Sequence, residues 1–192
     1  MVRQMTRVFA IALAAFLVLS VKPAEAAKKT FLESDDAKEK DEPQKYLADY
    51  DKLTKGKDAD WVYFPGGAGL KKGAAVSVKE FDANGRGRES RDAARDGKEY
   101  MEQWLEKQGF KVEKSGGDFV IEGNVFNAWE PHGAGRFWGG WMANPGVGLE
   151  VVAKDSKGNV VAQIRHKAKG STIRDAVENG LEEVAKALAS GN

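Results

Sequence analysis

The sequence predicts an α+β domain: a mixed, largely antiparallel sheet of about four to five strands with two helices packed on one face. Three observations predict this fold class. Several short stretches alternate apolar and polar residues, as half-buried strands do. Two longer stretches repeat apolar residues every three to four positions, as amphipathic helices do. The chain has 192 residues, of which 42% are hydrophobic, which is enough for one domain with an apolar core.

The first 27 residues are typical of a cleavable signal peptide. Arg3 and Arg7 form a basic start, residues 8–21 are apolar or small, and Ala24-Glu25-Ala26 supplies the small-x-small cleavage pattern. An uncleaved membrane anchor is the alternative, but the apolar run is shorter than the ~20 residues that span a bilayer. We therefore expect an exported protein, periplasmic or secreted, with no transmembrane segment after cleavage.

Residues 28–57 are expected to form a charged, flexible segment that precedes a single domain at 58–192. The most highly charged part is 35–42, and runs of this kind are usually solvated. Residues 46–53 also carry apolar positions, which could dock one short turn onto the domain.

The first half of the domain predicts two strands and a helix. Residues 61–64 form a short apolar run that a Pro-Gly-Gly sequence stops, and 74–81 alternate as a half-buried strand does. Residues 90–108 then repeat apolar or small residues with the period of a helix. Gly109 follows where a left-handed C-terminal cap would lie.

The second half predicts three strands and a final helix. Residues 155–159 have the composition of a hairpin turn, and Thr172 can cap a helix over 173–188. Three consecutive strands favour an antiparallel meander, and the earlier strand–helix–strand order could add a parallel pair through a right-handed crossover. The three strands are expected at 118–129, 147–154 and 160–167.

A loop of seventeen residues, 130–146, is much longer than a hairpin requires. Loops of that length tend to be functional or disordered, and this one is rich in glycine and in large apolar side chains. The favoured interpretation is that these side chains fold back over an open sheet face. Contact with a partner and a small-molecule pocket are the alternatives. The tentative partner-binding residues are Phe137, Trp138, Trp141 and Met142.

Composition excludes several classes of protein. The chain has no cysteine, which rules out disulfides, thiolate zinc sites and an N-terminal lipid on cysteine. The formal net charge is +1, and cleavage after residue 27 would remove three basic and one acidic residue, leaving −1. A near-neutral chain lacks the basic footprint of a protein that binds duplex nucleic acid.

No motif in the sequence assigns a catalytic residue, a cofactor or a metal. His132 and His166 do not have the spacing of paired metal ligands, and no nucleophile motif or phosphate-binding loop occurs. Carboxylate pairs for glycan cleavage are recognised by distance in space, so the sequence leaves them open. An arginine cluster over 86–95 indicates either an anion site at a helix N-terminus or, as we favour, a solvated face balanced by neighbouring acids.

The second half of the domain resembles domain-of-unknown-function family 4410 of exported bacterial proteins. In that family a strand, a Gly-rich loop and a strand ending in Asp-x-x-Gly-x-Val precede a C-terminal helix. The matching segments here are 119–125, the loop 130–146, 147–155 and 158–162. Residues 47–53 and 61–63 resemble the opening of the related family 3313. The resemblance covers residues 46–189 and implies a bacterial envelope setting and an α+β fold, but no catalytic residues.

The leading hypothesis is thus a non-enzymatic exported protein that binds an envelope protein partner through the glycine-aromatic loop or a free sheet edge. The rival hypothesis is a cell-wall or glycan hydrolase with an unidentified carboxylate pair. A structural subunit that forms a stable oligomer is a third possibility.

Overall fold

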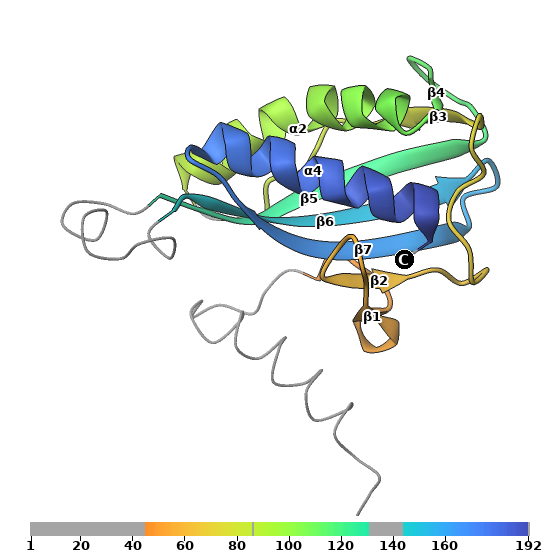
Figure 1. Cartoon of the computed structure of the whole chain (residues 1–192), viewed down its shortest axis with the longest axis horizontal. Helices are drawn as coiled ribbons and strands as arrows, with labels where there is room; N and C mark the ends of the chain where they lie inside the picture. The colour runs from red at the N-terminus through yellow and green to blue at the C-terminus, as the bar shows by residue number, and fades with distance from the viewer. Residues whose placement is uncertain (1–44, 86, 131–143, 192) are drawn as a thin grey trace, which may run out of the picture. The chain divides into compact units, whose positions relative to one another are not determined.

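Seven strands form one mixed sheet in the order β1-β2-β7-β6-β5-β3-β4 (Figure 1). The structure is a computed structural model that describes residues 45–85, 87–130 and 144–191. The strands are β1 (Thr54–Lys55), β2 (Trp61–Tyr63), β3 (Ala75–Val78), β4 (Lys111–Val112), β5 (Phe119–Trp129), β6 (Gly146–Asp155) and β7 (Val160–Lys169). The α+β class is confirmed.

The expected number of four to five strands is too low. The two additional strands, β1 and β4, lie at the two ends of the sheet and contain two residues each. A two-residue strand is too short to show an alternating pattern, because alternation needs about four residues to be recognised. Both edge strands are therefore found only through the partner strands that they pair with.

The centre of the sheet is the antiparallel meander that the sequence predicts. β5 pairs with β6 and β6 pairs with β7, so that Asn124, Glu150 and Arg165 lie side by side in one row across the three strands. At the turn between β6 and β7, Asp155 Oδ1 accepts hydrogen bonds from the backbone N–H of Lys157 and of Asn159. These bonds fix the tight hairpin.

The expected parallel pairing is also confirmed. β3 is followed by α2 (Arg88–Lys107), and the chain then returns as β4, which pairs with β3 in parallel. β3 is also parallel to β5. Gly109, directly after the helix, has φ +90°, the left-handed conformation that glycine adopts most easily.

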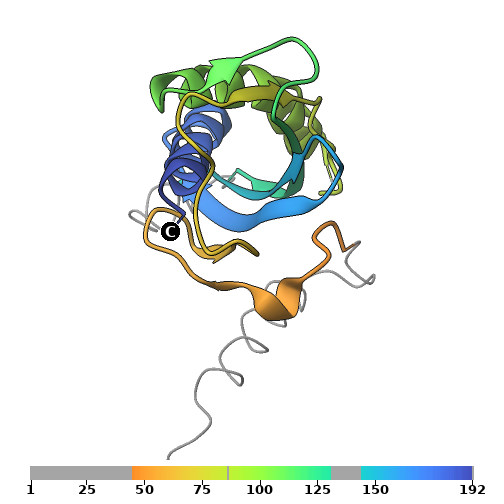
Figure 2. The ribbon, with the colours of Figure 1, turned by 90° about the vertical axis from the view of Figure 1, so that its right-hand side faces the viewer.

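Both helices cover the same face of the sheet, which we call the inner face (Figure 2). The second helix, α4 (Ile173–Ser190), begins after Thr172, whose Oγ1 accepts a hydrogen bond of 3.1 Å from the backbone N–H of Asp175. Such a cap contributes about 1 kcal/mol. The large side chains buried between the helices and the sheet include Met101, Leu105, Ile121, Leu149, Ile164, Leu181 and Leu188.

The opposite, outer face of the sheet is partly covered by residues 45–53, which we call the N-terminal strap. It contains the 3-10 turn η1 (Tyr50–Lys52) and leads directly into β1. Leu47 and Leu53 are 3% and 2% exposed and pack with Val152 of β6. The short docked turn that the sequence suggests is therefore present, and it positions the edge strand that follows.

Candidate functional site

The predicted contact residues Phe137, Trp138, Trp141 and Met142 lie outside the described residues. The structure does place the two ends of their loop, because Trp129 at the end of β5 pairs with Gly146 at the start of β6. The assignment of these four side chains to core, contact surface or pocket stays a prediction.

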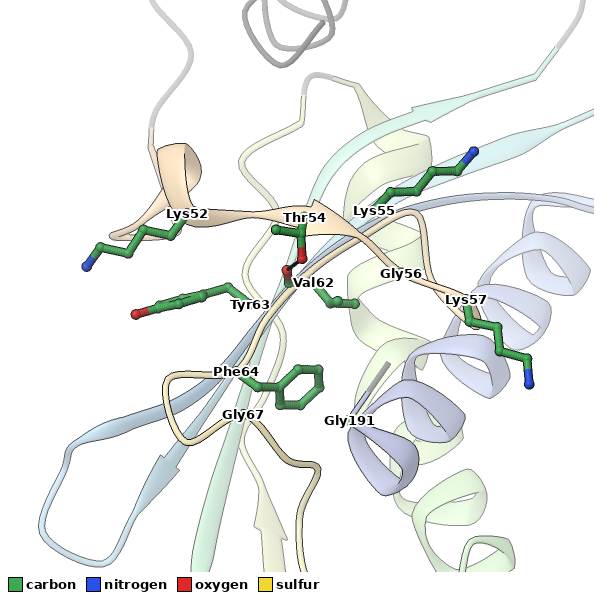
Figure 3. A pocket seen from close by; sticks show the side chains of 10 residues that line it. All are labelled: Lys52, Thr54, Lys55, Gly56, Lys57, Val62, Tyr63, Phe64, Gly67 and Gly191. Carbon is green, nitrogen blue, oxygen red and sulfur yellow. Dashed lines mark hydrogen bonds between the residues drawn. The ribbon is translucent and has the colours of Figure 1, made fainter. Parts of the chain in front are cut away.

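A groove of about 540 Å³ lies at the β1 end of the sheet (Figure 3). It forms where the β1–β2 hairpin, the turn that follows β2 and the end of α4 meet. Val62 is 5% exposed and Phe64 is partly buried against the main core, so together they give the groove a small apolar floor among polar lining groups. The lining residues are Lys52, Thr54, Lys55, Gly56, Lys57, Val62, Tyr63, Phe64, Gly67 and Gly191.

The rim of the groove is basic. Three of the lining residues are lysines and none is acidic, and Figure 3 shows their side chains extending outward from the groove in three directions. Asp49 lies 2.6 Å from the Lys52 ammonium, and this hydrogen bond raises the pKa of Lys52. Lys55 and Lys57 are exposed, and no described residue forms an ion pair with either. The groove therefore presents two uncompensated positive charges beside an apolar surface.

The backbone of β1 is available for a further strand. Gly56 donates its N–H to Asp60 O, so these two residues form a hydrogen-bonded pair. Along an antiparallel pair of strands, hydrogen-bonded and non-hydrogen-bonded pairs alternate. The Thr54–Val62 pair is thus a bonded one, and the backbone N–H and C=O of Lys55 point away from β2. Because β1 is the end strand of the sheet, these two groups face the outer edge.

A buried polar network on the outer face anchors the strap that leads into β1. Tyr50 donates its hydroxyl to Glu150 Oε1 over 2.6 Å, and Glu150 also forms a salt bridge with Arg165. Gln163 Oε1 accepts from the backbone N–H of Ala48 and Asp49. The Arg165 guanidinium further lies 3.8 Å from the centre of the Phe126 ring. The bonds from Tyr50, Ala48 and Asp49 hold the strap against β6 and β7.

Neither this groove nor this network follows from a local pattern in the sequence. Glu150 and Arg165 alternate with apolar neighbours, so they are expected to face solvent, yet they are 1% and 5% exposed. The sequence feature that indicates a covered outer face is the strap itself, because its tyrosines and leucines need an apolar surface to pack against. The three lysines of the rim fall in the segment expected to be charged and flexible.

His166 lies between two carboxylates on the inner face. Its Nδ1 is 3.2 Å from Asp60 Oδ2, and Glu183 Oε2 is 2.5 Å from Nε2 but at an angle outside hydrogen-bonding geometry. Burial alone would raise the pKa of Asp60. The contact with His166 and the N–H of Lys167 outweigh burial, so the pKa is lowered. A hydrolase that used these two acids would need the space between them for water or substrate. Here the imidazole occupies that space.

The described residues also bear on three other questions that the sequence raises: a metal site, a membrane-spanning helix and the arginine cluster. Within the part of the chain that the structure describes, no cluster of His, Asp and Glu has an arrangement that could hold a metal ion. No described helix is long and apolar enough to cross a membrane. On α2, Arg88 and Arg95 lie 3.4 and 3.1 Å from Asp92, as expected for a solvated face balanced by acids.

Comparison with known proteins identifies the fold alone. Neither a protein-family model nor a curated protein sequence matches the chain, so the resemblance to families 4410 and 3313 stays a prediction. Among solved structures, two of the PelC dodecamer from Paraburkholderia phytofirmans have a fold similar to that of this chain. The two matches have TM-scores of 0.52 and 0.51 and identities of 19% and 18%; they cover 68% and 67% of this chain and 98% and 97% of the PelC chain.

Proposed function

We propose that this chain is an exported, non-enzymatic protein that binds an envelope protein partner through the β1 edge of its sheet. One observation carries the proposal: the outward-facing backbone N–H and C=O of Lys55 lie beside a groove with an apolar floor. A free sheet edge gives affinity through main-chain hydrogen bonds, and an adjacent pocket gives selectivity for side chains.

Export is the part of the proposal that rests on the leader, residues 1–27. Expressed in its bacterial host, the protein is expected in the periplasm or the medium, with an N-terminus at residue 27 or 28 after cleavage. Intact-mass measurement of the purified protein tests this expectation. Recovery of the full-length chain from the cytosol would contradict it.

The partner site can be tested by site-specific photo-crosslinking. A photoreactive amino acid at Lys55 should capture a partner in the envelope fraction, while the same group at Lys114, beyond β4 at the opposite end of the sheet, is the matched control. The proposal predicts an adduct specific to Lys55. Identical adducts at both positions, or none at Lys55, would refute it.

The glycine-aromatic loop is the second contact that the sequence suggests. Combining Trp138→Ala with Trp141→Ala removes two large apolar side chains from it. If the loop is the contact, the folded double variant loses the captured partner. If the β1 edge is the contact, the adduct at Lys55 persists.

The partner could also be a second copy of the chain, since the PelC structures of similar fold are dodecamers. Sedimentation of the mature protein distinguishes the cases. A stable oligomer that dissociates when Lys55 is replaced by proline would identify the edge as a self-association surface. A monomer directs the search to another protein.

A further inference from the structure

We infer that the groove beside β1 selects an extended acidic peptide in which apolar side chains alternate with carboxylates. The inference rests on the proposed strand addition and names the chemistry of the segment added. It follows from three properties of the groove: the direction of its backbone groups, the polarity of its floor and the charge of its rim.

The backbone fixes the position of the peptide. A strand added to β1 would pair with the outward N–H and C=O of Lys55, as β2 pairs with the inward groups of Thr54 and Gly56. Side chains of an extended peptide point alternately to the two sides of the sheet. Neighbouring peptide residues therefore meet different surfaces.

The two surfaces differ in chemistry. Val62 and Phe64 offer the groove's apolar floor to one set of peptide side chains. Lys55 pairs with Trp61, whose side chain packs against the outer-face cluster, so its ammonium group is on the side that meets the other set. Lys52 lies over the Tyr63 ring on that same side. Lys55 and Lys57 lack an acidic partner in the described structure, so a carboxylate would meet uncompensated positive charge. A basic peptide would be repelled, and a fully apolar one would leave both charges unpaired.

Fluorescence anisotropy of labelled six-residue peptides tests the inference on the mature protein. The first peptide alternates Glu with Leu or Phe, the second has Lys in place of Glu, and the third groups the same acidic and apolar residues into two blocks. The alternating acidic peptide should bind at least about tenfold more tightly than either control, and its affinity should fall as salt is raised.

Two variants at one position separate the backbone from the charge. Lys55→Pro removes the outward N–H and leaves the hydrogen bonds to β2 in place. It should lower the affinity for the alternating acidic peptide about tenfold or more. Lys55→Ala keeps the N–H and should lower the affinity for the same peptide only a few-fold. Circular dichroism of both variants checks that the fold is retained.

Each outcome bears on a different claim. Equal binding of the acidic and basic peptides overturns the acidic selectivity and leaves strand addition standing. Equal binding of the alternating and block peptides overturns the alternation. Unchanged binding in folded Lys55→Pro overturns strand addition at β1, and with it the proposed function. Absence of binding by all three peptides overturns the inference, while the crosslinking experiment at Lys55 still decides the proposed function by itself.

Discussion

The two faces of the sheet are stabilised by different interactions. The inner face packs Leu149, Ile164 and their neighbours against two helices, with these side chains fully buried. The outer face has a smaller apolar cluster and a buried row of Asn124, Glu150 and Arg165, with Tyr50 of the strap bonded to Glu150. Apolar packing tolerates small adjustments, whereas a buried ion pair needs both partners. The outer face should therefore be the more sensitive to single changes that leave a charge unpaired.

The adjacent residues Leu149 and Glu150 point to opposite faces and give the largest expected contrast. Glu150→Leu leaves the Arg165 guanidinium buried without its carboxylate, and it should cost about 3–5 kcal/mol of the free energy of unfolding. The double variant Glu150→Leu/Arg165→Met removes both charges and should recover most of the loss. Urea denaturation monitored by tryptophan fluorescence measures both.

Leu149→Ala is the matched inner-face variant and should cost about 2–5 kcal/mol, because it leaves a cavity in the core. No substitution at position 165 should recover that loss, because the two residues lie on opposite faces. A double charge variant as unstable as Glu150→Leu alone would show that the outer face does not depend on pairing of these two charges.

The same contrast explains how far the sequence alone could predict the structure. The inner face follows from periodicity: both helices, the meander and the parallel pair were predicted because apolar side chains repeat with the period of their element. The outer face breaks that rule, since Glu150, Gln163 and Arg165 are polar and yet buried. Only a segment distant in sequence, the strap, covers them, and local patterns do not report such pairings. The groove has no local signature for a related reason, because β1 is two residues long and lies among charged residues.

Tyr50 links the strap to the buried ion pair, and its removal should have an intermediate effect. Tyr50→Phe deletes the hydroxyl that donates to Glu150, a bond to a charged group worth about 1.5–3 kcal/mol. Burial, together with the nearby Glu150 charge, raises the pKa of Tyr50 to about 12. A raised folded-state pKa stabilises the protein below the unfolded value of 10.0 and loses that contribution as the pH rises toward 12.

Denaturation of the wild type and Tyr50→Phe between pH 8 and about pH 12 tests this assignment. The stability difference between the two proteins should be constant up to about pH 10 and should shrink above it. Tyr63, whose ring packs in the same outer-face cluster, provides the control variant Tyr63→Phe. An equal pH dependence in both variants would contradict a specific role for the Tyr50 hydroxyl.

Substitution of Asp60 should have the smallest effect. Asp60 contacts His166, which is a buried polar side chain on the otherwise apolar inner face. Because the folded-state pKa of Asp60 lies below its ordinary value of 3.8, its carboxylate stabilises the fold above that value. The contribution is lost as the pH falls below about 4. Asp60→Asn keeps the size of the side chain but removes the charge, so it should lower the melting temperature slightly at pH 7 and by less at pH 3. Asp118→Asn, which also changes an acid that accepts a backbone N–H but lies far from His166 in the sheet order, is the control. A loss for Asp60→Asn that stays the same from pH 7 to pH 3 would mean that the carboxylate acts there as a hydrogen-bond acceptor and not through its charge.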